Sequence, residues 1–224
     1  MGRCQKCEAE RIAAEEARRI KREHVQRVAK VSELLKNAGI PSRFSDKDFA
    51  GYKATTQPQR VALTACRRYA ETWRDQLAKG GSLVLTGSPG TGKTHLACAI
   101  ANTIIPQHLA SAAFGTVASM LRHVKSTYSK SSERSEQDAL NDLCRPDLLI
   151  VDEVGVQVGS EHEKLLLFEI FNERYQQCRP TIVMSNLNTD DLETFLGHRI
   201  MDRYRECGVV LAFDWSSYRG AKAA

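Results

Sequence analysis

The sequence predicts an α/β protein in which a parallel β-sheet is covered by helices on both faces and preceded by an N-terminal helix. Three observations lead to this fold class. Short apolar runs, typical of buried strands, alternate with longer segments of helical composition. A glycine-rich motif directly follows the first of these runs. Another apolar run ends in two acidic residues, as expected where a strand delivers side chains to a site at the edge of a sheet.

The first segment of the chain predicts a long helix. Residues 8–38 are rich in Ala, Glu, Lys and Arg, which favour helices, and Gly39 and Pro41 then end it. Two interpretations stay open, a solvated leader and a helix that binds a partner. A modest apolar stripe runs along this helix and consists of Ile20, Val28, Val31 and Leu35.

Strands and helices alternate from residue 82 onward, and no internal repeat is visible. We expect helices at 91–105, 118–129 and 163–177, and a polar loop at 129–138. We expect strands at 82–87, 112–117, 147–153, 181–186 and 209–215.

Charge is distributed unevenly over the 224 residues, whose formal net charge is +5. Residues 1–53 hold 13 Lys and Arg against 8 Asp and Glu, whereas the rest of the chain holds 19 of each. Bulk charge therefore does not indicate nucleic-acid binding by the main part of the chain, and such binding requires a local patch. We divide the chain into a basic helical leader (1–38), a connector (39–58) and a nucleotide-binding domain (59–224).

The sequence predicts a cytoplasmic protein without membrane contact. No apolar run reaches the roughly 18 residues that a membrane span requires, and the polar N-terminus is unlike a secretory signal. The seven cysteines are odd in number and lie mostly among apolar residues, which indicates reduced, buried thiols rather than a disulfide framework.

A phosphate-binding motif, GSPGTGKT, occupies residues 87–94 and matches G-x-x-x-x-G-K-[ST]. Its glycines let the backbone turn N–H groups toward phosphate oxygens, and the helix that follows adds the positive end of its dipole. We expect Lys93 to contact the β- and γ-phosphates of ATP and the Thr94 hydroxyl to bind Mg²⁺. The predicted ATP-binding residues of this segment are Gly87, Ser88, Pro89, Gly90, Thr91, Gly92, Lys93, Thr94 and His95.

Polar residues at the ends of two further strands complete a catalytic hypothesis. Asp152 ends the run LLIVD and is expected to hold Mg²⁺, directly or through water. Glu153 is expected to polarise the water that attacks the γ-phosphate, a role that a hydrolysing ATPase needs and a small-molecule kinase does not. Asn186, at the end of TIVMSN, is a candidate to hydrogen-bond this water or the γ-phosphate, and a strand-end turn is its alternative role.

These stretches together resemble the AAA+ ATPases, P-loop NTPases that form a three-layer sandwich around a parallel sheet, and in particular the DnaC-type replicative helicase loaders. The resemblance covers residues from about 39 to 219 and implies an ATP-dependent protein that places a hexameric DnaB-type helicase on single-stranded DNA in replication initiation. IstB-type transposition helper ATPases share the core and are an alternative, as is a binding module that uses ATP only to set its conformation. The stretches are GSPGTGKTHLACAI, LLIVDEVGVQ, TIVMSNLN, LGHRIMDRYRE and FDWSSYR.

Three late arginines receive roles from this resemblance. In AAA+ assemblies an arginine of one subunit reaches the γ-phosphate held by its neighbour. Arg203 looks like this arginine, with Arg199 as a supporting or alternative candidate, because both lie in the G-x-R-x-x-D-R box. Arg219, in SSYR, resembles the sensor arginine that contacts ATP in its own subunit. An arginine that acts across subunits implies self-association in the ATP-bound form.

The resemblance also implies a contact with single-stranded DNA. The segment ASMLRHVKSTYS carries cations that can follow phosphates and an aromatic ring that can stack on a base. A solvated helix face is the alternative. The predicted DNA-contacting residues are Arg122, Lys125, Tyr128, Ser160 and His162.

The N-terminal leader is where this sequence departs from the family. Family members carry an N-terminal domain that binds the helicase, whereas only about 38 residues precede the connector here. Cys4 and Cys7 have the spacing of half a zinc site without a second pair nearby. We interpret the leader as a partial helicase-binding region or the remnant of a longer zinc module.

Overall fold

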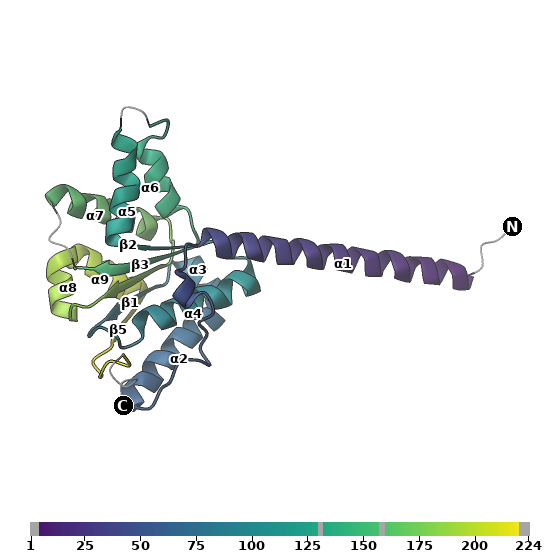
Figure 1. Ribbon diagram of the computed structural model, residues 1–224, viewed down its shortest axis with the longest axis horizontal. Coiled ribbons are helices and arrows are strands. Elements are labelled where there is room, and N and C mark those ends of the chain that lie inside the picture. Colours follow the sequence, from purple (N-terminus) through teal and green to yellow (C-terminus); the bar gives the residue numbers. More distant parts are fainter. Residues whose placement is uncertain (1–4, 130–131, 157–159, 220–224) are drawn as a thin grey trace.

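The computed structural model describes residues 5–129, 132–156 and 160–219, with side chains from residue 15 onward. A central parallel sheet lies between two layers of helices, and helix α1 projects away from this body (Figure 1). The predicted α/β sandwich with its N-terminal helix is therefore confirmed.

Within the described residues, five strands form one sheet in the order β2–β3–β4–β1–β5, and each neighbouring pair is parallel. Because all strands run the same way, their carboxyl ends meet at one edge of the sheet. The strands are β1 (Ser82–Thr86), β2 (Ala112–Thr116), β3 (Leu148–Val154), β4 (Thr181–Ser185) and β5 (Gly208–Ala212).

The helices divide between the two faces of the sheet. One face is covered by α2 (Gln57–Glu71), α3 (Trp73–Lys79) and α4 (Lys93–His108), together with the end of α1 (Gln5–Asn37). The other face is covered by α5 (Val117–Lys125), α6 (Glu136–Cys144), α7 (Glu161–Gln176), α8 (Thr189–Leu196) and α9 (His198–Cys207). Two short 3₁₀ turns, η1 (Ser42–Phe44) and η2 (Ser126–Tyr128), complete the described elements.

Each central strand is apolar on both sides because it supplies two cores. In β1, Leu83 and Leu85 pack with α2 and α4, whereas Val84 packs with the helices of the opposite face. The same alternation places Ile182 of β4 in the first core and Val183 in the second. This follows from the two-residue period of a strand and explains why the sequence shows continuous apolar runs rather than an apolar–polar alternation.

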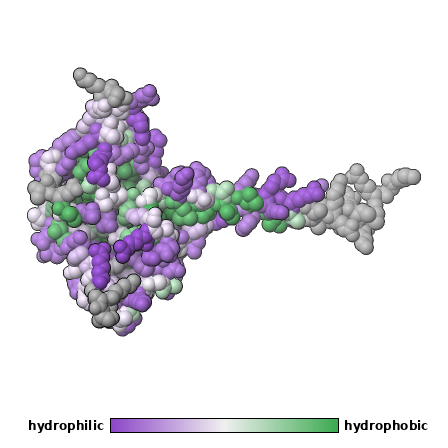
Figure 2. All heavy atoms as spheres, viewed as in Figure 1, coloured by the Kyte–Doolittle hydropathy of each residue, from purple (hydrophilic) through white to green (hydrophobic). Residues whose placement is uncertain are grey.

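Among the side chains that the structure describes, α1 is attached to the body through Arg27 and through residues at its C-terminal end. The Phe114 amide of edge strand β2 donates to the Ala38 carbonyl at 2.7 Å, and Arg27 Nη2 donates to the Pro106 and Gln107 carbonyls at 2.8 and 3.0 Å. Residues 15–30 are exposed, and hydrophobic side chains follow the projecting helix among polar ones (Figure 2). The large exposed apolar side chains of α1 are Ile20, Val25 and Val28.

The element boundaries differ from expectation in a few places. The expected polar loop at 129–138 is wrong in its last residues, because α6 begins at Glu136 with Ser135 as its N-cap. Helices α2 and α3 were not predicted. The expectation of buried thiols holds for Cys66, Cys98 and Cys144, whereas Cys178 is exposed.

A buried cation joins the ends of several elements at the edge opposite the strands' carboxyl ends. Arg174 of α7 is fully buried, and burial lowers its pKa to about 10, so it stays charged at neutral pH. Oxygens of the protein, mostly carbonyls, surround the guanidinium and replace its water shell. Its acceptors are the carbonyls of Leu143 and Cys144 (both 3.0 Å), Pro146 (2.9 Å) and Pro180 (2.6 Å), and the Thr181 hydroxyl (3.0 Å).

Arg174→Ala should lower the free energy of unfolding by about 3 kcal/mol or more, because several buried carbonyl groups lose their donor and a cavity remains. Urea denaturation followed by circular dichroism measures this change. Arg179→Ala is the matched control: it removes a half-buried ion pair of 2.7 Å with Asp147 and should change stability by less than about 1 kcal/mol. Equal effects of the two variants would contradict this account of Arg174.

Candidate functional site

The glycine motif forms a loop between β1 and α4, at the carboxyl edge of the sheet. Gly87, Gly90 and Gly92 all have positive φ angles, of 113°, 79° and 95°. A Cβ atom on Gly87 would lie 2.6 Å from the Phe213 carbonyl oxygen, and one on Gly90 would lie 2.0 Å from Ser217 Oγ. Glycine is therefore required here both by backbone conformation and by the close approach of the C-terminal segment.

Lys93 folds back onto the loop that precedes it. Its Nζ donates to the carbonyls of Gly87 and Ser88 at 2.6 and 2.8 Å, and only 6% of the residue is exposed. Burial lowers the pKa of Lys93, while the charge of Asp152 acts in the opposite direction. The ammonium group thus lies inside the loop, beside the peptide groups that a phosphate would contact.

The loop is linked directly to the end of β3. Thr94 Oγ1 donates to Asp152 Oδ2 at 3.1 Å, and the Glu153 amide donates to the other carboxylate oxygen at 2.8 Å. A hydroxyl and a carboxylate oxygen are the kinds of ligand that Mg²⁺ prefers. The sheet thereby brings together the two predicted magnesium ligands from positions 58 residues apart in the chain.

Glu153 has an unusual backbone conformation. Its φ angle is +60°, and the pairing of β3 with β4 is interrupted between Val151 and Val154. The left-handed region is rarely adopted by residues other than glycine, and such conformations concentrate at functional sites. The result is that Glu153 is exposed beside the half-buried Asp152, although both belong to the same strand.

The end of β4 contacts the same loop. The Gly87 amide donates to the Leu187 carbonyl at 3.1 Å, and Ser185 Oγ donates to the Val154 carbonyl at 2.6 Å. Asn186 lies between these two contacts and is exposed. Asn186 therefore directly follows the end of β4, where the sequence predicts it.

The C-terminal segment lies over the loop of its own chain. A Cβ atom on Gly90 would lie 3.5 Å from Arg219 Cδ, and the positive charge of Arg219 contributes to lowering the pKa of Lys93. Arg219 is exposed and follows Tyr218, whose amide donates to the Gly90 carbonyl at 3.0 Å. The structure thus places the predicted sensor arginine next to the phosphate-binding loop.

Sequence reasoning missed two aromatic residues of this site. The Tyr52 hydroxyl and the Trp215 indole N–H both donate to the Thr91 carbonyl, at 3.2 and 3.0 Å. His95, which is predicted to contact ATP, has Nε2 2.8 Å from the Asp48 carbonyl oxygen and its ring centroid 5.5 Å from that of Tyr52. The connector therefore contacts the loop, a relation that residues 39 positions apart do not reveal in the sequence.

The two box arginines lie elsewhere, on α9 facing α7. The Arg203 guanidinium lies 4.7 Å from the Tyr175 ring centroid and donates to the Asn172 side chain. Arg199 is exposed and lies 5.8 Å from the Phe168 ring centroid. Cation–π contacts of this kind hold both arginines along one surface of the molecule.

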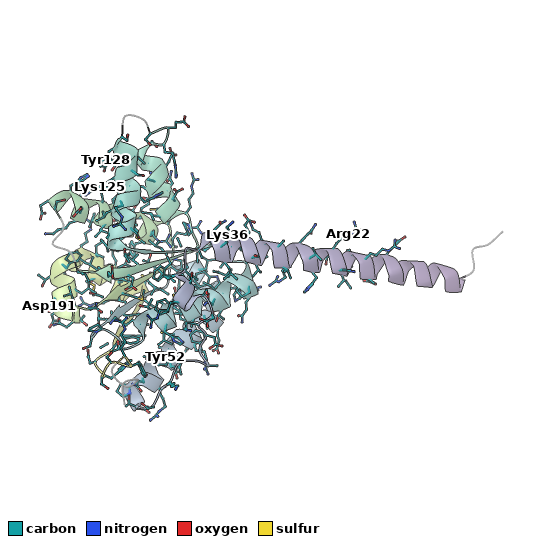
Figure 3. The ribbon with its side chains drawn as sticks, in the orientation of Figure 1. Arg22, Lys36, Tyr52, Lys125, Tyr128 and Asp191 are labelled. Atoms are coloured by element: carbon teal, nitrogen blue, oxygen red, sulfur yellow. The ribbon has the colours of Figure 1, made fainter. Side chains whose placement is uncertain are left out.

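The predicted DNA-contacting residues partly converge where α5 and η2 meet the start of α7. The Tyr128 hydroxyl lies 3.1 Å from His162 Nε2 and 3.2 Å from Glu136, and Lys125 forms an ion pair of 2.7 Å with Glu163. Figure 3 shows Lys125 and Tyr128 far from Tyr52. Of the remaining two residues, Arg122 is exposed on α5, whereas Ser160 is the N-cap of α7, where its hydroxyl accepts from an amide of that helix.

The predicted zinc half-site cannot be placed, because Cys4 and the side chain of Cys7 lie outside the described residues. Among the residues that the structure describes, no group of three or more His, Cys, Asp or Glu side chains is arranged to hold a metal ion. No described helix has both the length and the apolar character needed to cross a membrane.

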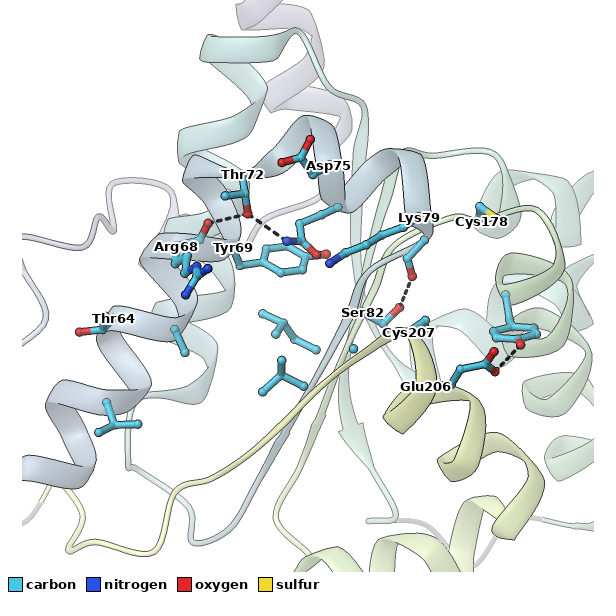
Figure 4. Close-up of a pocket in the computed structure, with 18 of the residues that line it drawn as sticks. Thr64, Arg68, Tyr69, Thr72, Asp75, Lys79, Ser82, Cys178, Glu206 and Cys207 are labelled. Atoms are coloured by element: carbon cyan, nitrogen blue, oxygen red, sulfur yellow. Dashed lines mark hydrogen bonds between the residues drawn. The ribbon is translucent and has the colours of Figure 1, made fainter.

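A separate groove of about 1340 Å³ opens between α2, α3 and the edge strand β5 (Figure 4). Its lining comes from residues 57–83 and 175–209, so it does not include the phosphate-binding loop. Arg68 and Lys79 lie on the helical side, and Glu206, which accepts from the Tyr175 hydroxyl at 2.6 Å, lies on the other.

Comparison with known proteins agrees with this geometry. The family model described as "IstB-like ATP binding protein" matches residues 9–222. The chain belongs to this family. It is 38% identical to the replicative helicase loader DnaC of Buchnera aphidicola subsp. Acyrthosiphon pisum over 191 residues, which cover 85% of this chain and 76% of the relative.

Two further similarities extend the comparison. Identity to the replicative helicase loader DnaC of Escherichia coli K12 is 35% over 198 residues, which cover 88% of this chain and 79% of that protein. The crystal structure of a DnaC helicase loader superimposes with a TM-score of 0.69 at 22% identity and covers 77% of this chain and 99% of that one, which confirms the AAA+ fold. The matching family is described as ATP-binding, and the glycine loop of this chain is bonded to Asp152 through Thr94.

Lys93→Ala should weaken MgATP binding about 10- to 100-fold, because a charge-assisted contact with the phosphates is lost. Isothermal titration calorimetry measures the dissociation constant. Lys164→Ala, which removes an exposed lysine paired with Glu161 at 2.9 Å, should bind MgATP like the unsubstituted chain. Unchanged affinity in Lys93→Ala would remove this lysine from the nucleotide site.

Proposed function

We propose that this protein is an ATP-dependent loader that places a replicative hexameric helicase of the DnaB type on single-stranded DNA during the initiation of DNA replication. The observation that carries the proposal is the similarity of 85–88% of the chain to curated replicative helicase loaders, at 35–38% identity. It is supported by the phosphate-binding loop, in which the Thr94 hydroxyl is hydrogen-bonded to Asp152.

We propose that the nucleotide site hydrolyses ATP as well as binding it. We propose that Lys93 leaves the loop carbonyls to contact the phosphates, and that Thr94 and Asp152 supply the magnesium ligands. Magnesium would neutralise charge on the phosphates when bound. Glu153 would accept a proton from the attacking water, and Asn186 would orient that water. Arg219 would contact the nucleotide from its own chain.

A second copy of the chain would complete this site. Glu153, Asn186 and Arg219 are all exposed, so the site is open on one side. Arg203 and Arg199 lie on another surface of the molecule, against α7. We propose that Arg203 of one copy stabilises charge at the nucleotide of the next, supported by Arg199, and that ATP therefore promotes self-association. Hydrolysis is then expected to be weak in the isolated chain and stimulated by assembly or DNA.

The other two contacts of a loader are assigned to separate parts of the chain. We propose that single-stranded DNA contacts Arg122, Lys125 and Tyr128, with His162 and Ser160 beside them; the Ser160 hydroxyl also caps α7. We propose that the leader, residues 1–38, binds the helicase through the exposed apolar side chains of α1, while 59–224 form the ATPase domain. The connector, 39–58, packs on the ATPase domain through Tyr52. Such a protein would act in the cytoplasm.

A transposition helper is the second candidate, favoured by the description of the matching family as IstB-like. Affinity purification of the tagged chain from its host, with MgATP present, separates the two. A hexameric helicase in the eluate supports the loader, and a transposase in its place would contradict the loader function.

A variant with Ile20, Val25 and Val28 changed to Ser should no longer retain the helicase in this purification, while it should still bind MgATP.

Glu153→Gln should bind MgATP with nearly unchanged affinity and hydrolyse it about 100-fold more slowly or worse, because the proton acceptor is lost. Release of phosphate, measured beside calorimetric binding, tests this. Glu161→Gln changes an exposed glutamate of α7 and should leave both properties intact. Normal turnover in Glu153→Gln would exclude Glu153 as the proton acceptor. If the unsubstituted chain shows no turnover even with DNA, the protein is better described as a switch that binds ATP without hydrolysing it.

Mixing Lys93→Ala protein with Arg203→Ala protein should restore part of the ATPase activity that each lacks alone, because one complete site can form between the two variants. Mixing Lys93→Ala with Glu153→Gln is the control. Both of these changes damage the same half of the site, so that pair should stay inactive. If the first mixture shows no recovery at any ratio, Arg203 does not act across subunits.

A further inference from the structure

The carbonyl groups of the phosphate-binding loop accept hydrogen bonds from two kinds of donor, one within the glycine motif and one outside it. Lys93 Nζ bonds to the carbonyls of Gly87 and Ser88, and must leave them to reach a phosphate. The carbonyls of Gly90 and Thr91 are instead held by groups outside the loop. Since Thr91 is fully buried, its carbonyl depends on these donors in place of water.

Three aromatic residues supply these outside contacts. Tyr52 Oη and Trp215 Nε1 donate to the Thr91 carbonyl at 3.2 and 3.0 Å, and the Tyr218 amide donates to the Gly90 carbonyl at 3.0 Å. Tyr52 and Trp215 share the Thr91 carbonyl as their acceptor, and the Tyr52 and Tyr218 rings meet edge to face with centroids 5.9 Å apart. The Tyr218 hydroxyl also donates to the Lys53 carbonyl at 2.5 Å. We call Tyr52, Trp215 and Tyr218 the aromatic clamp.

The clamp fixes the direction of amide groups as well as carbonyls. In a trans peptide the N–H points opposite to the C=O of the same unit. Holding the Thr91 carbonyl toward Tyr52 and Trp215 therefore turns the Gly92 N–H away from them, and holding the Gly90 carbonyl does the same for the Thr91 N–H. These are amides of the kind that bind phosphate oxygens in such loops. Tyr52 also packs on Gly92, where a Cβ atom would lie 2.6 Å from its ring.

We propose that Tyr52 and Trp215 are positioning residues of the nucleotide site, which hold the Gly92 peptide unit in its phosphate-binding orientation while Lys93 exchanges its loop carbonyls for phosphate. This role rests on the nucleotide site proposed above, and it belongs to residues that lie outside the glycine motif. Burial also raises the pKa of Tyr52, so its hydroxyl remains a proton donor across the physiological range.

Because Tyr52 and Trp215 share the Thr91 carbonyl as acceptor, their substitutions should have non-additive effects on MgATP binding. A carbonyl oxygen with two donors stays satisfied when one is removed, whereas removal of both leaves a buried acceptor without a partner. The peptide would then rotate toward water, and ATP binding would have to restore its orientation. Each of Tyr52→Phe and Trp215→Phe should weaken MgATP binding about 3-fold, and the double variant about 50-fold, well beyond the about 9-fold product of the two.

Calorimetric titration of the four proteins with MgATP tests this coupling, with thermal unfolding as a check that each is folded. Tyr69→Phe is the matched control: it removes another buried hydroxyl, which donates to the Gly81 carbonyl at 2.6 Å, and should lower stability while changing MgATP affinity less than about 2-fold. The chain has two tryptophans, and an ATP-dependent change in fluorescence should disappear in Trp215→Phe.

The results distinguish failure of the aromatic-clamp proposal from failure of the nucleotide site itself. Synergy of the double variant, with an unaffected control, supports the proposal. Strictly multiplicative effects, or a loss of affinity in Tyr69→Phe as large as in the clamp variants, would overturn it while leaving the nucleotide site intact. Failure of the unsubstituted chain to bind MgATP would overturn both.

Discussion

The hydrogen bond between Thr94 and Asp152 is the contact on which the rest of the site depends. It joins the loop after β1 to the end of β3, and it exists because a parallel sheet ends all its strands at the same edge. Both side chains are also the predicted magnesium ligands. The same parallel arrangement brings the end of β4 to the loop through the Gly87 amide. Burial of two apolar cores therefore builds the site as a consequence of folding.

The loop itself is held from several directions by distant parts of the chain. The connector reaches it through Tyr52, the C-terminal segment through Trp215, and α4 begins within it. The connector is in turn fastened to α4, because the Asn102 side chain donates to the carbonyls of Phe44 and Lys47 at 3.0 and 2.8 Å. The connector therefore links the loop to the C-terminal end of α1, the helix proposed to bind the helicase.

The sequence predicts the positions of site residues that belong to one short motif. It does not predict contacts between residues that lie far apart in the chain. Lys93, Thr94 and Asp152 belong to short local motifs, and the structure shows Lys93 on the loop and Thr94 bonded to Asp152. Tyr52 and Trp215 meet Thr91 from 39 and 124 residues away, and no local pattern indicates such contacts. Helix α2 was missed although a signal existed, since its buried residues recur at helical spacing. The buried residues of α2 are Gln59, Ala62, Cys66, Tyr69 and Ala70.

The central claim is that one triphosphate is bound by one copy of the chain and completed by an arginine of another. Glu153, Asn186 and Arg219 are exposed, and we propose that the second copy contacts the site on this side. Sedimentation velocity with a non-hydrolysable ATP analogue, Mg²⁺ and single-stranded DNA tests the claim most directly. The account predicts assemblies larger than one chain that disappear when the nucleotide is omitted. A chain that sediments as a monomer at every concentration with all three ligands present would contradict it.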